Sequence, residues 1–351
     1  MHAATIDQAG LPARDSWKIL GGLRFVLAMI VCLGHLSRFA PDSGLINRGL
    51  LRFGSFGATA AVFGFLLISG YSIAHSITIS PKGYFKRRML RIYPLYLLGI
   101  GLALLPFTFV PSPVHGLGAD FELPDLATIA GNLLMLQGII VHPISSNAPL
   151  WTLGVEVCCY LLAPLFVRAP RSAVTAIIVL SSIAYAAFPA FHLVFFSQLL
   201  FGLPFLFMVW AWLTGFVLYF HRHDSRYRIG VPCLGTLLFS TNRLFMTRFS
   251  IFTYVASSTL ILFADEIELP GVVLAFLNYC GEVSYPVYIF HVPVLLFCYA
   301  VLKIRNGLAM VLAVLLCSAF FYHLVDQPIR RRRPTSLARA LQPKSLPAST
   351  I

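Results

Sequence analysis

Two ionisable side chains stand inside the first long apolar stretch of the sequence. Arg24 and His35 lie within LRFVLAMIVCLGHL, residues 23–36, eleven positions apart. On an α-helix, at about 100° and 1.5 Å per residue, they would share nearly one face and lie about 16 Å apart. Ionisable groups inside a membrane-spanning helix are costly and usually face the protein interior, where they mark a functional site. A snorkelling arginine and a buried, hydrogen-bonded histidine are the purely structural alternative.

A second group of cations lies in PKGYFKRRMLRIYP, residues 81–94. Its members are Lys82, Lys86, Arg87, Arg88 and Arg91. Arg88 and Arg91 are three positions apart and would share one helix face. The planar guanidinium group suits phosphate oxygens, so these two residues and Arg24 are candidates for binding a phosphate. The alternative is that the cluster only follows the positive-inside rule and contacts anionic lipid.

Composition identifies the class of protein that must position these residues. Of 351 residues, 58% are hydrophobic and 11% charged, and the mean hydropathy is +0.82. Soluble domains carry about 25% charged residues, so the chain is a polytopic integral membrane protein. The net charge of +13 does not indicate nucleic-acid binding, because the basic residues form short clusters between apolar runs. The seven cysteines lie in apolar segments without C-x-x-C spacing, which predicts buried thiols and neither a disulfide framework nor a metal site.

The apolar stretches predict an all-α bundle of about ten transmembrane helices. The expected spans are 17–40, 54–77, 92–110, one of 126–141 and 150–167, then 172–190, 199–220, 229–242, 249–264, 271–300 and 307–324. If both 126–141 and 150–167 crossed, the basic loop 221–228 would face outward, against the positive-inside rule. We therefore expect a short or re-entrant segment near 126–149, buried in protein or beside a water-lined cavity.

Further polar patterns follow the first two in a fixed order. They are Ser69-Gly70-Tyr71, Arg88-x-x-Arg91 before Ile-Tyr-Pro, Trp151-Thr-Leu-Gly-Val-Glu156, Gly281-Glu-Val-Ser284-Tyr285-Pro-Val-Tyr288-Ile-Phe-His291, and Tyr322-His-Leu-Val-Asp326-Gln-Pro328. Together with Arg24 and His35 they resemble the membrane acyltransferase-3 family. Its members are O-acyltransferases that modify surface polysaccharides, Nod factors, antibiotics and related substrates. The resemblance covers about residues 15–334.

The sequence departs from the family pattern at three positions. Val157 stands where the family often has a second acid, Thr152 replaces a serine, and Asp326 replaces the late glutamate. These changes leave open which carboxylate assists the chemistry. We expect Asp326, at the end of a span beside basic residues, to be structural.

The resemblance implies transfer of an acyl group from acyl-coenzyme A to a hydroxyl group. Such a transfer needs a base for the hydroxyl proton, and imidazole exchanges a proton near neutral pH. We expect His35, about halfway along its span, to be that base. Glu156 is the expected partner that orients the imidazole, as in a catalytic triad, although a structural ion pair with an intramembrane arginine is the alternative. Arg24, Arg88 and Arg91 would hold the phosphates of coenzyme A.

The remaining candidates for cavity or substrate contacts are Ser69, Tyr71, Trp151, Tyr285 and His291. Ser69 and Tyr71 would donate hydrogen bonds in the cavity, or Ser69 would only allow close helix packing. His291, a second histidine in an apolar segment, is a candidate relay or substrate contact, with a structural role as the alternative.

The expected reaction moves an acetyl group from acetyl-coenzyme A, taken from the cytosol, to a hydroxyl of a sugar in a surface or lipid-linked glycan. Acyl-coenzyme A is then a co-substrate, no cofactor is permanently bound, and the other partner is membrane lipid. Succinyl or another acyl group and a non-sugar acceptor stay open. A transporter or flippase without covalent chemistry is the alternative from another class, but such folds often consist of two related halves and no halved pattern is apparent here.

The expected organisation has three parts. Residues 1–16 form a cytosolic N-terminal segment, 17–326 the transmembrane acyltransferase domain, and 327–351 a basic cytosolic tail. The location expected from this family is the bacterial inner (cytoplasmic) membrane, with both termini in the cytosol.

Overall fold

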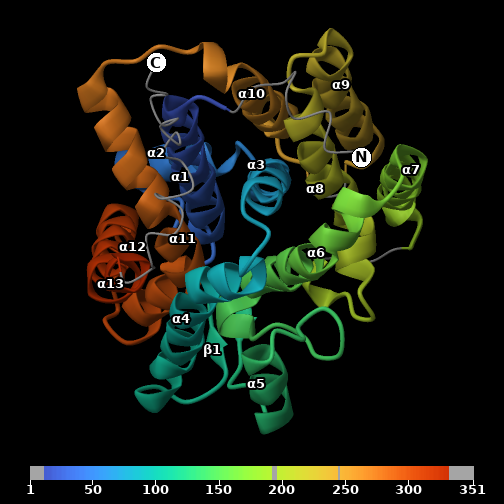
Figure 1. Cartoon of the computed structure of the whole chain (residues 1–351). Helices are drawn as coiled ribbons and strands as arrows, with labels where there is room; N and C mark the ends of the chain where they lie inside the picture. The colour runs from blue at the N-terminus through green and yellow to red at the C-terminus, as the bar shows by residue number, and fades with distance from the viewer. Residues whose placement is uncertain (1–11, 192–195, 244–245, 332–351) are drawn as a thin grey trace, which may run out of the picture.

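The computed structural model describes residues 12–191, 196–243 and 246–331, and their regular structure is nearly all helical (Figure 1). The helices are α1 (Arg14–Leu36), α2 (Leu45–Gly54), α3 (Ala58–Ile79), α4 (Tyr84–Leu104), α5 (Leu126–Leu133), α6 (Trp151–Arg168), α7 (Arg171–Ala187), α8 (Leu203–His221), α9 (Ser225–Thr241), α10 (Ser250–Phe263), α11 (Gly271–Ala300), α12 (Gly307–Phe321) and α13 (Gln327–Arg331). A small antiparallel hairpin, the one sheet among the described residues, joins β1 (Val114–His115) to β2 (Asp120–Phe121). The protein is thus an all-α integral membrane bundle.

The described residues contain seven helical segments that are long and apolar enough to cross a membrane. They are Arg14–Leu36, Ala58–Ile79, Tyr84–Thr108, Ser145–Arg168, Leu203–His221, Gly271–Ala300 and Gly307–Arg331. The expected spans at 172–190, 229–242 and 249–264 correspond to α7, α9 and α10, which have 17, 17 and 14 residues. At 1.5 Å per residue, these helices are about 21–26 Å long, less than the roughly 30 Å of a hydrocarbon core.

Several helix ends differ from the expected spans. Helix α4 begins at Tyr84 rather than residue 92, so Arg88 and Arg91 belong to its first two turns. Helix α1 ends at Leu36, and His35 therefore lies in its last turn rather than halfway along a span. The short helix α2 was not expected. The predicted tail begins as helix α13, and its residues 332–351 lie outside the described residues.

The segment 126–149 forms no helix long enough to cross. Helix α5 has eight residues, about 12 Å of rise, and the chain then turns back into an isolated bridge between Gln137 and Val141. Asp125 caps the start of α5, and its carboxylate accepts a hydrogen bond of 2.7 Å from the Thr128 amide. This bond lowers the pKa of Asp125. Asn132 is buried and donates to the carbonyl of His142 at 2.8 Å, which ties the returning chain to α5.

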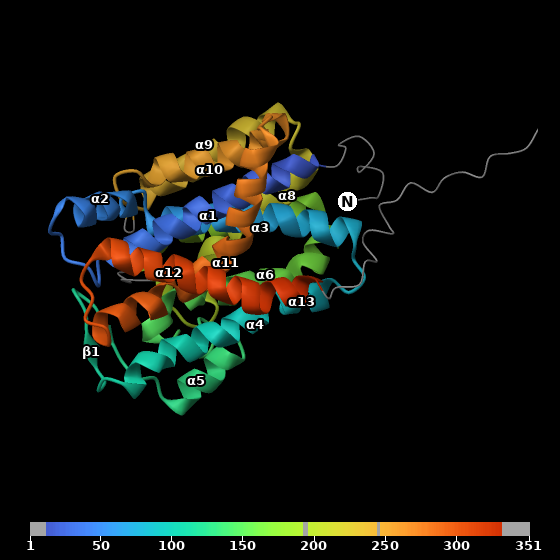
Figure 2. The ribbon, with the colours of Figure 1, turned by 90° about the vertical axis from the view of Figure 1, so that its left-hand side faces the viewer.

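Helices α1 and α11 pack side by side, and glycines let them approach closely (Figure 2). A Cβ atom placed on Gly21 would lie only 3.2 Å from the Cα of Gly281. Small residues at such crossings allow membrane helices to come into backbone contact. This packing also fixes the relative depth of His35 on α1 and His291 on α11.

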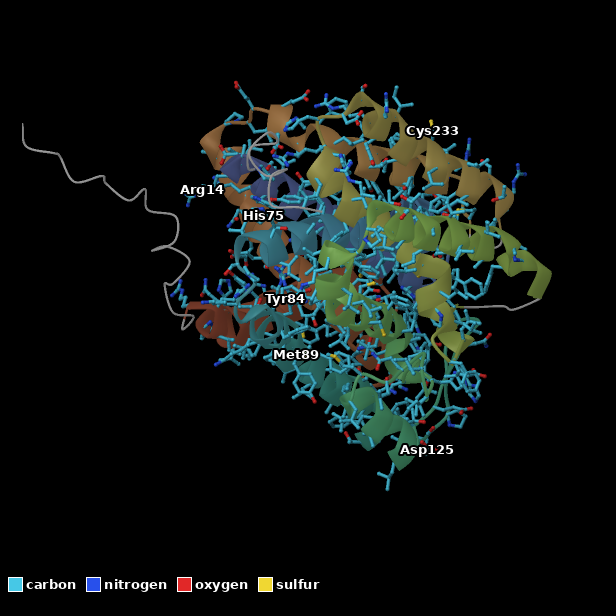
Figure 3. All side chains as sticks on the ribbon, turned by 45° about the vertical axis from the view of Figure 1, so that its right-hand side comes forward. Arg14, His75, Tyr84, Met89, Asp125 and Cys233 are labelled. Atoms are coloured by element: carbon cyan, nitrogen blue, oxygen red, sulfur yellow. The ribbon has the colours of Figure 1, made fainter. Side chains whose placement is uncertain are left out.

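The bundle has two distinct ends. In Figure 2, the start of α1 and α13 lie at one end, and α2 and β1 lie at the other. Figure 3 labels Arg14, His75 and Tyr84 at the first of these, where α1 and α4 begin and α3 finishes. We call this the proximal end and the end with α2 and the hairpin the distal end.

We expected all seven cysteines to be buried, but only some of them are. Cys32, Cys159, Cys280 and Cys298 are buried, but Cys233 on α9 is exposed and points away from the bundle (Figure 3). All seven cysteines lie in the described residues and are free thiols. Helix α9 runs at the periphery of the fold, so an apolar segment does not by itself imply burial in protein.

Candidate functional site

A cavity of about 100 Å³ lies among α1, α3, α4, α6 and α11, and we call it the proximal cavity. Its charged lining consists of Arg24, Arg88, Arg91 and Glu156. The arginines come from the middle of α1 and the first two turns of α4. The structure therefore brings together the three cations that the sequence proposed as phosphate ligands, and it places the Glu156 carboxylate with them.

Glu156 is held by hydroxyl groups. Ser69 Oγ donates to Glu156 Oε1 at 2.8 Å, and the hydroxyl of Tyr160, one turn further along α6, donates to the same oxygen. The indole N–H of Trp212 in turn donates to Ser69 Oγ at 3.3 Å. Among the described residues, no ion pair within 4.0 Å involves Glu156. The alternative expectation, an ion pair between Glu156 and an intramembrane arginine, is thus not met in these residues.

The arginines of the proximal cavity are left with unused donor groups. None of the three takes part in an ion pair within the described ranges. The guanidinium carbon of Arg88 lies 5.9 Å from the ring centres of both Tyr84 and Tyr160, and its Nε is buried without a hydrogen-bond partner. Three cations face one carboxylate, so the cavity is suited to an anion, and a buried unsatisfied donor is costly until a ligand accepts its hydrogen bond.

A larger cavity of about 640 Å³ opens towards the distal end. We call it the distal cavity. His35 lines it, with Arg38, Asp120, His142 and Trp151 as the other prominent polar and aromatic groups. The Trp151 ring stacks on Phe196 with centroids 5.6 Å apart and an interplanar angle of 22°. This cavity combines a candidate base with an aromatic face and groups that donate and accept hydrogen bonds.

His35 and His291 form a pair. His35 Nδ1 lies 2.9 Å from the carbonyl of Val31 and 3.3 Å from His291 Nε2, while His291 Nδ1 lies 2.7 Å from the carbonyl of Tyr288. A carbonyl oxygen only accepts, so each neutral imidazole carries its proton on Nδ1. His291 Nε2 then accepts from His35, and the lone pair of His35 is on Nε2. That nitrogen has no hydrogen-bond partner in the part of the chain that the structure describes, so it is available to accept a proton.

The expected pairing of His35 with Glu156 is not formed. Glu156 lines the proximal cavity and His35 the distal cavity, and the near partner of His35 is His291. The two side chains lie at different depths in the bundle, as the order of residues along α6 shows. Trp151 lies at the distal cavity, Thr152 lines both, and Glu156 lies about 6 Å further along the helix than Thr152.

The other predicted site residues are divided among three places. Ser69 and Tyr285 line the proximal cavity, and Tyr285 donates its hydroxyl hydrogen bond to the Ile92 carbonyl at 3.0 Å. Trp151 lines the distal cavity. Tyr71 lines neither cavity and packs its buried ring against Trp17. The ring of Tyr71 thus packs among aromatic side chains outside both cavities.

Several lining residues were not predicted from the sequence, among them Arg38, Asp120, Tyr160, Thr152 and Tyr288. Tyr160 bonds to Glu156, and its position four residues later on the same helix was the available signal. Tyr288 and Thr152 line both cavities and bond to one another at 2.7 Å. Both lie inside motifs, but nothing in their spacing indicates that they meet. Asp326 is paired with Arg330, in keeping with the structural role expected for it.

Comparison with known proteins identifies the family. Residues 17–323 match the model of the acyltransferase domain that defines the acyltransferase-3 family. A stretch of 161 residues is 30% identical to the acyltransferase MdmB of Streptomyces mycarofaciens. This match covers 43% of the present chain and 39% of MdmB, so the chain spans well under two thirds of that relative. No solved structure matches the chain. The protein therefore belongs to the acyltransferase-3 family of membrane-embedded acyltransferases.

Proposed function

We propose that the protein transfers an acyl group, in the first place acetyl, from acyl-coenzyme A to a hydroxyl of a sugar in a surface or lipid-linked glycan. One observation carries this proposal. A cavity with three arginines and one carboxylate abuts a second cavity that contains a histidine with a free Nε2. Donor and acceptor can then bind separately and meet between the two.

The proximal cavity is the proposed donor site. Arg24, Arg88 and Arg91 bind the phosphates of coenzyme A, and the unpartnered Nε of Arg88 gains an acceptor. Glu156, with the hydroxyls of Ser69 and Tyr160, lies beyond the arginines and contacts the donor near its thioester. A carboxylate there would repel phosphate, which favours one orientation of the donor, with its phosphates at the arginines.

The distal cavity is the proposed acceptor site. An acceptor hydroxyl gives its proton to His35 Nε2 as its oxygen attacks the thioester carbon, and the proton passes on to the departing thiolate as the C–S bond breaks. The Val31 carbonyl and His291 Nε2 both accept from His35 Nδ1 and so hold the His35 ring in the required tautomer. The Trp151 face and the side chains of Arg38 and Asp120 suit a hydroxylated, sugar-like acceptor.

The proposed topology places the proximal end in the cytosol of a bacterium, at the inner membrane. The basic start of α4 supports this orientation through the positive-inside rule. Both termini would be cytosolic. About ten crossings are proposed, with the shorter helices α7, α9 and α10 spanning where the bilayer is locally thinned. The segment 126–149 would enter and leave from one side, and its short helix α5 agrees with that.

The test uses membranes that contain the intact protein, acetyl-coenzyme A labelled on the acetyl group, and host envelope glycans as acceptor. We expect base-labile label in the glycan fraction with the intact protein and its loss in His35→Ala. The matched control is His75→Ala, which removes an imidazole from α3 that lines neither cavity. Equal label with and without His35 would exclude it as the base. If purified protein binds no acyl-coenzyme A at all, the transferase proposal fails and a transporter becomes the better explanation.

A further inference from the structure

Three residues line both cavities, and they form the boundary between them. Val62 comes from α3, Thr152 from the start of α6 and Tyr288 from α11. Each is only 7% exposed. We call these three residues the wall. Since these side chains contact both cavities, the donor side and the acceptor side adjoin at them.

Polar contacts hold the wall in place. Tyr288 OH and Thr152 Oγ1 are 2.7 Å apart, and both hydroxyls also lie near the Pro149 carbonyl, at 3.3 Å and 3.0 Å. The Tyr288 ring also meets Phe65 edge to face, with centroids 5.4 Å apart. A buried side chain fixed on both its ring and its hydroxyl has little rotamer freedom. The wall is therefore a defined surface.

We propose that Val62, Thr152 and Tyr288 close the end of the acyl pocket and so determine how long an acyl group the protein accepts. This inference rests on the proposed function. If the coenzyme A phosphates bind at the arginines, the acyl end of the donor points away from them and meets the wall. His35 lies in the distal cavity, which adjoins the proximal cavity at the wall. Transfer therefore requires the thioester carbon at the edge of the wall, open to the acceptor, while the acyl chain packs against the wall.

The size of the proximal cavity supports a short acyl group. Its free space of about 100 Å³ is small beside the 300–1,000 Å³ of common ligand pockets. A longer acyl chain needs more of this limited space than a short one, and the wall bounds the space on the distal side. In an apolar pocket, one methylene too many or too few changes selectivity by about 10- to 200-fold. Removing methyl groups from the wall should therefore change chain-length preference by a measurable factor.

The test measures binding of two ketone analogues of acyl-coenzyme A, in which a methylene separates the sulfur from the carbonyl so that no acyl transfer occurs. One carries an acetyl-length group and the other a hexanoyl-length group. Calorimetry with the purified full chain in detergent gives both dissociation constants without an acceptor. We expect the intact protein to bind the short analogue at least about tenfold more tightly. Val62→Ala should reduce that ratio by about tenfold through tighter binding of the long analogue, and Val62→Leu should increase it.

The matched control is Val155→Ala, which makes the same change at a buried valine of α6 that lines neither cavity. It should leave the ratio unchanged. Thr152→Ser removes one methyl group from the wall but keeps the hydroxyl that bonds to Tyr288. If Val62→Ala does not fold, the ratio of the two dissociation constants in Thr152→Ser tests the inference instead. An unchanged ratio in the wall variants, or an equal change in Val155→Ala, overturns the inference.

The test also separates this inference from the function beneath it. If the intact protein binds the short and long analogues equally, coenzyme A binding stands and the wall does not limit the acyl group. If the intact protein binds neither analogue, the proposed function itself fails, and the inference fails with it.

Discussion

Arg88 offers the sharpest test of the donor site. Its Nε is buried without a partner, and its guanidinium group is held near two tyrosine rings at the edge of the proximal cavity. A hydrogen bond to a charged group contributes about 1.5–3 kcal/mol. At about 1.4 kcal/mol per factor of ten, Arg88→Gln should weaken acetyl-coenzyme A binding by about 10- to 150-fold.

The assay compares two donors. Acetyl-coenzyme A carries the phosphates, whereas the acetyl thioester of N-acetylcysteamine presents the same reacting group without them. Arg88→Gln should raise KM for acetyl-coenzyme A by the factor above and leave kcat/KM for the short thioester within about twofold, because only the lost phosphate contact distinguishes the donors. The contrast should shrink at high salt, since screening weakens the contribution of the arginine.

Lys86→Gln is the matched control, because Lys86 lies on the same helix, is exposed and does not line the cavity. If Arg88→Gln impairs both donors equally, the residue supports the fold rather than the phosphates. If it impairs neither, or if Lys86→Gln has the same effect, the phosphate-binding argument is wrong.

Two further predictions follow from the packing of α1 against α11. His291→Phe removes one of the two acceptors of the His35 Nδ1 proton, leaving only the Val31 carbonyl, and should lower kcat about tenfold without changing donor affinity. His291→Gln keeps an acceptor at this position and should retain most of the rate and its pH profile; equal losses in the two variants would contradict a positioning role. Gly281→Val should lower both the thermal stability in detergent and the activity, because its Cβ would lie 2.5 Å from the Cα of Gly21 and overpacking costs about 1–3 kcal/mol or more. Gly101→Val, at a helix position with open space, is the control, and a similar loss there would show that the effect belongs to the substitution rather than to the crossing.

Much of the fold class followed from composition and order of motifs. The low charged fraction and long apolar runs predicted a polytopic helical membrane protein, and the described residues are nearly all helical. The motif order predicted the acyltransferase-3 family, which the match over residues 17–323 confirmed. The number of crossings was harder, because α7, α9 and α10 are apolar but short. Hydropathy reports that a segment avoids water, and it does not distinguish a full crossing from a shorter helix.

The candidate arginines could be recognised from the sequence because this requires only the spacing of residues on one helix. Arg88 and Arg91 share a helix face through their spacing, and each is costly to bury without a partner. Glu156 was also recognisable as an acid within an apolar helix. Its contacts were not, since Ser69 and Trp212 come from helices that lie far away in the sequence.

The sequence by itself determined which residue types are available, which helices carry them and which family the chain belongs to. Only the tertiary structure decided which of them meet. Sequence spacing fixes the angle of a residue on its own helix, but the depth at which two helices cross depends on their packing, as at Gly21 and Gly281. That depth brings His35 to His291, leaves Glu156 in the other cavity, and joins Thr152 to Tyr288 at the boundary between them.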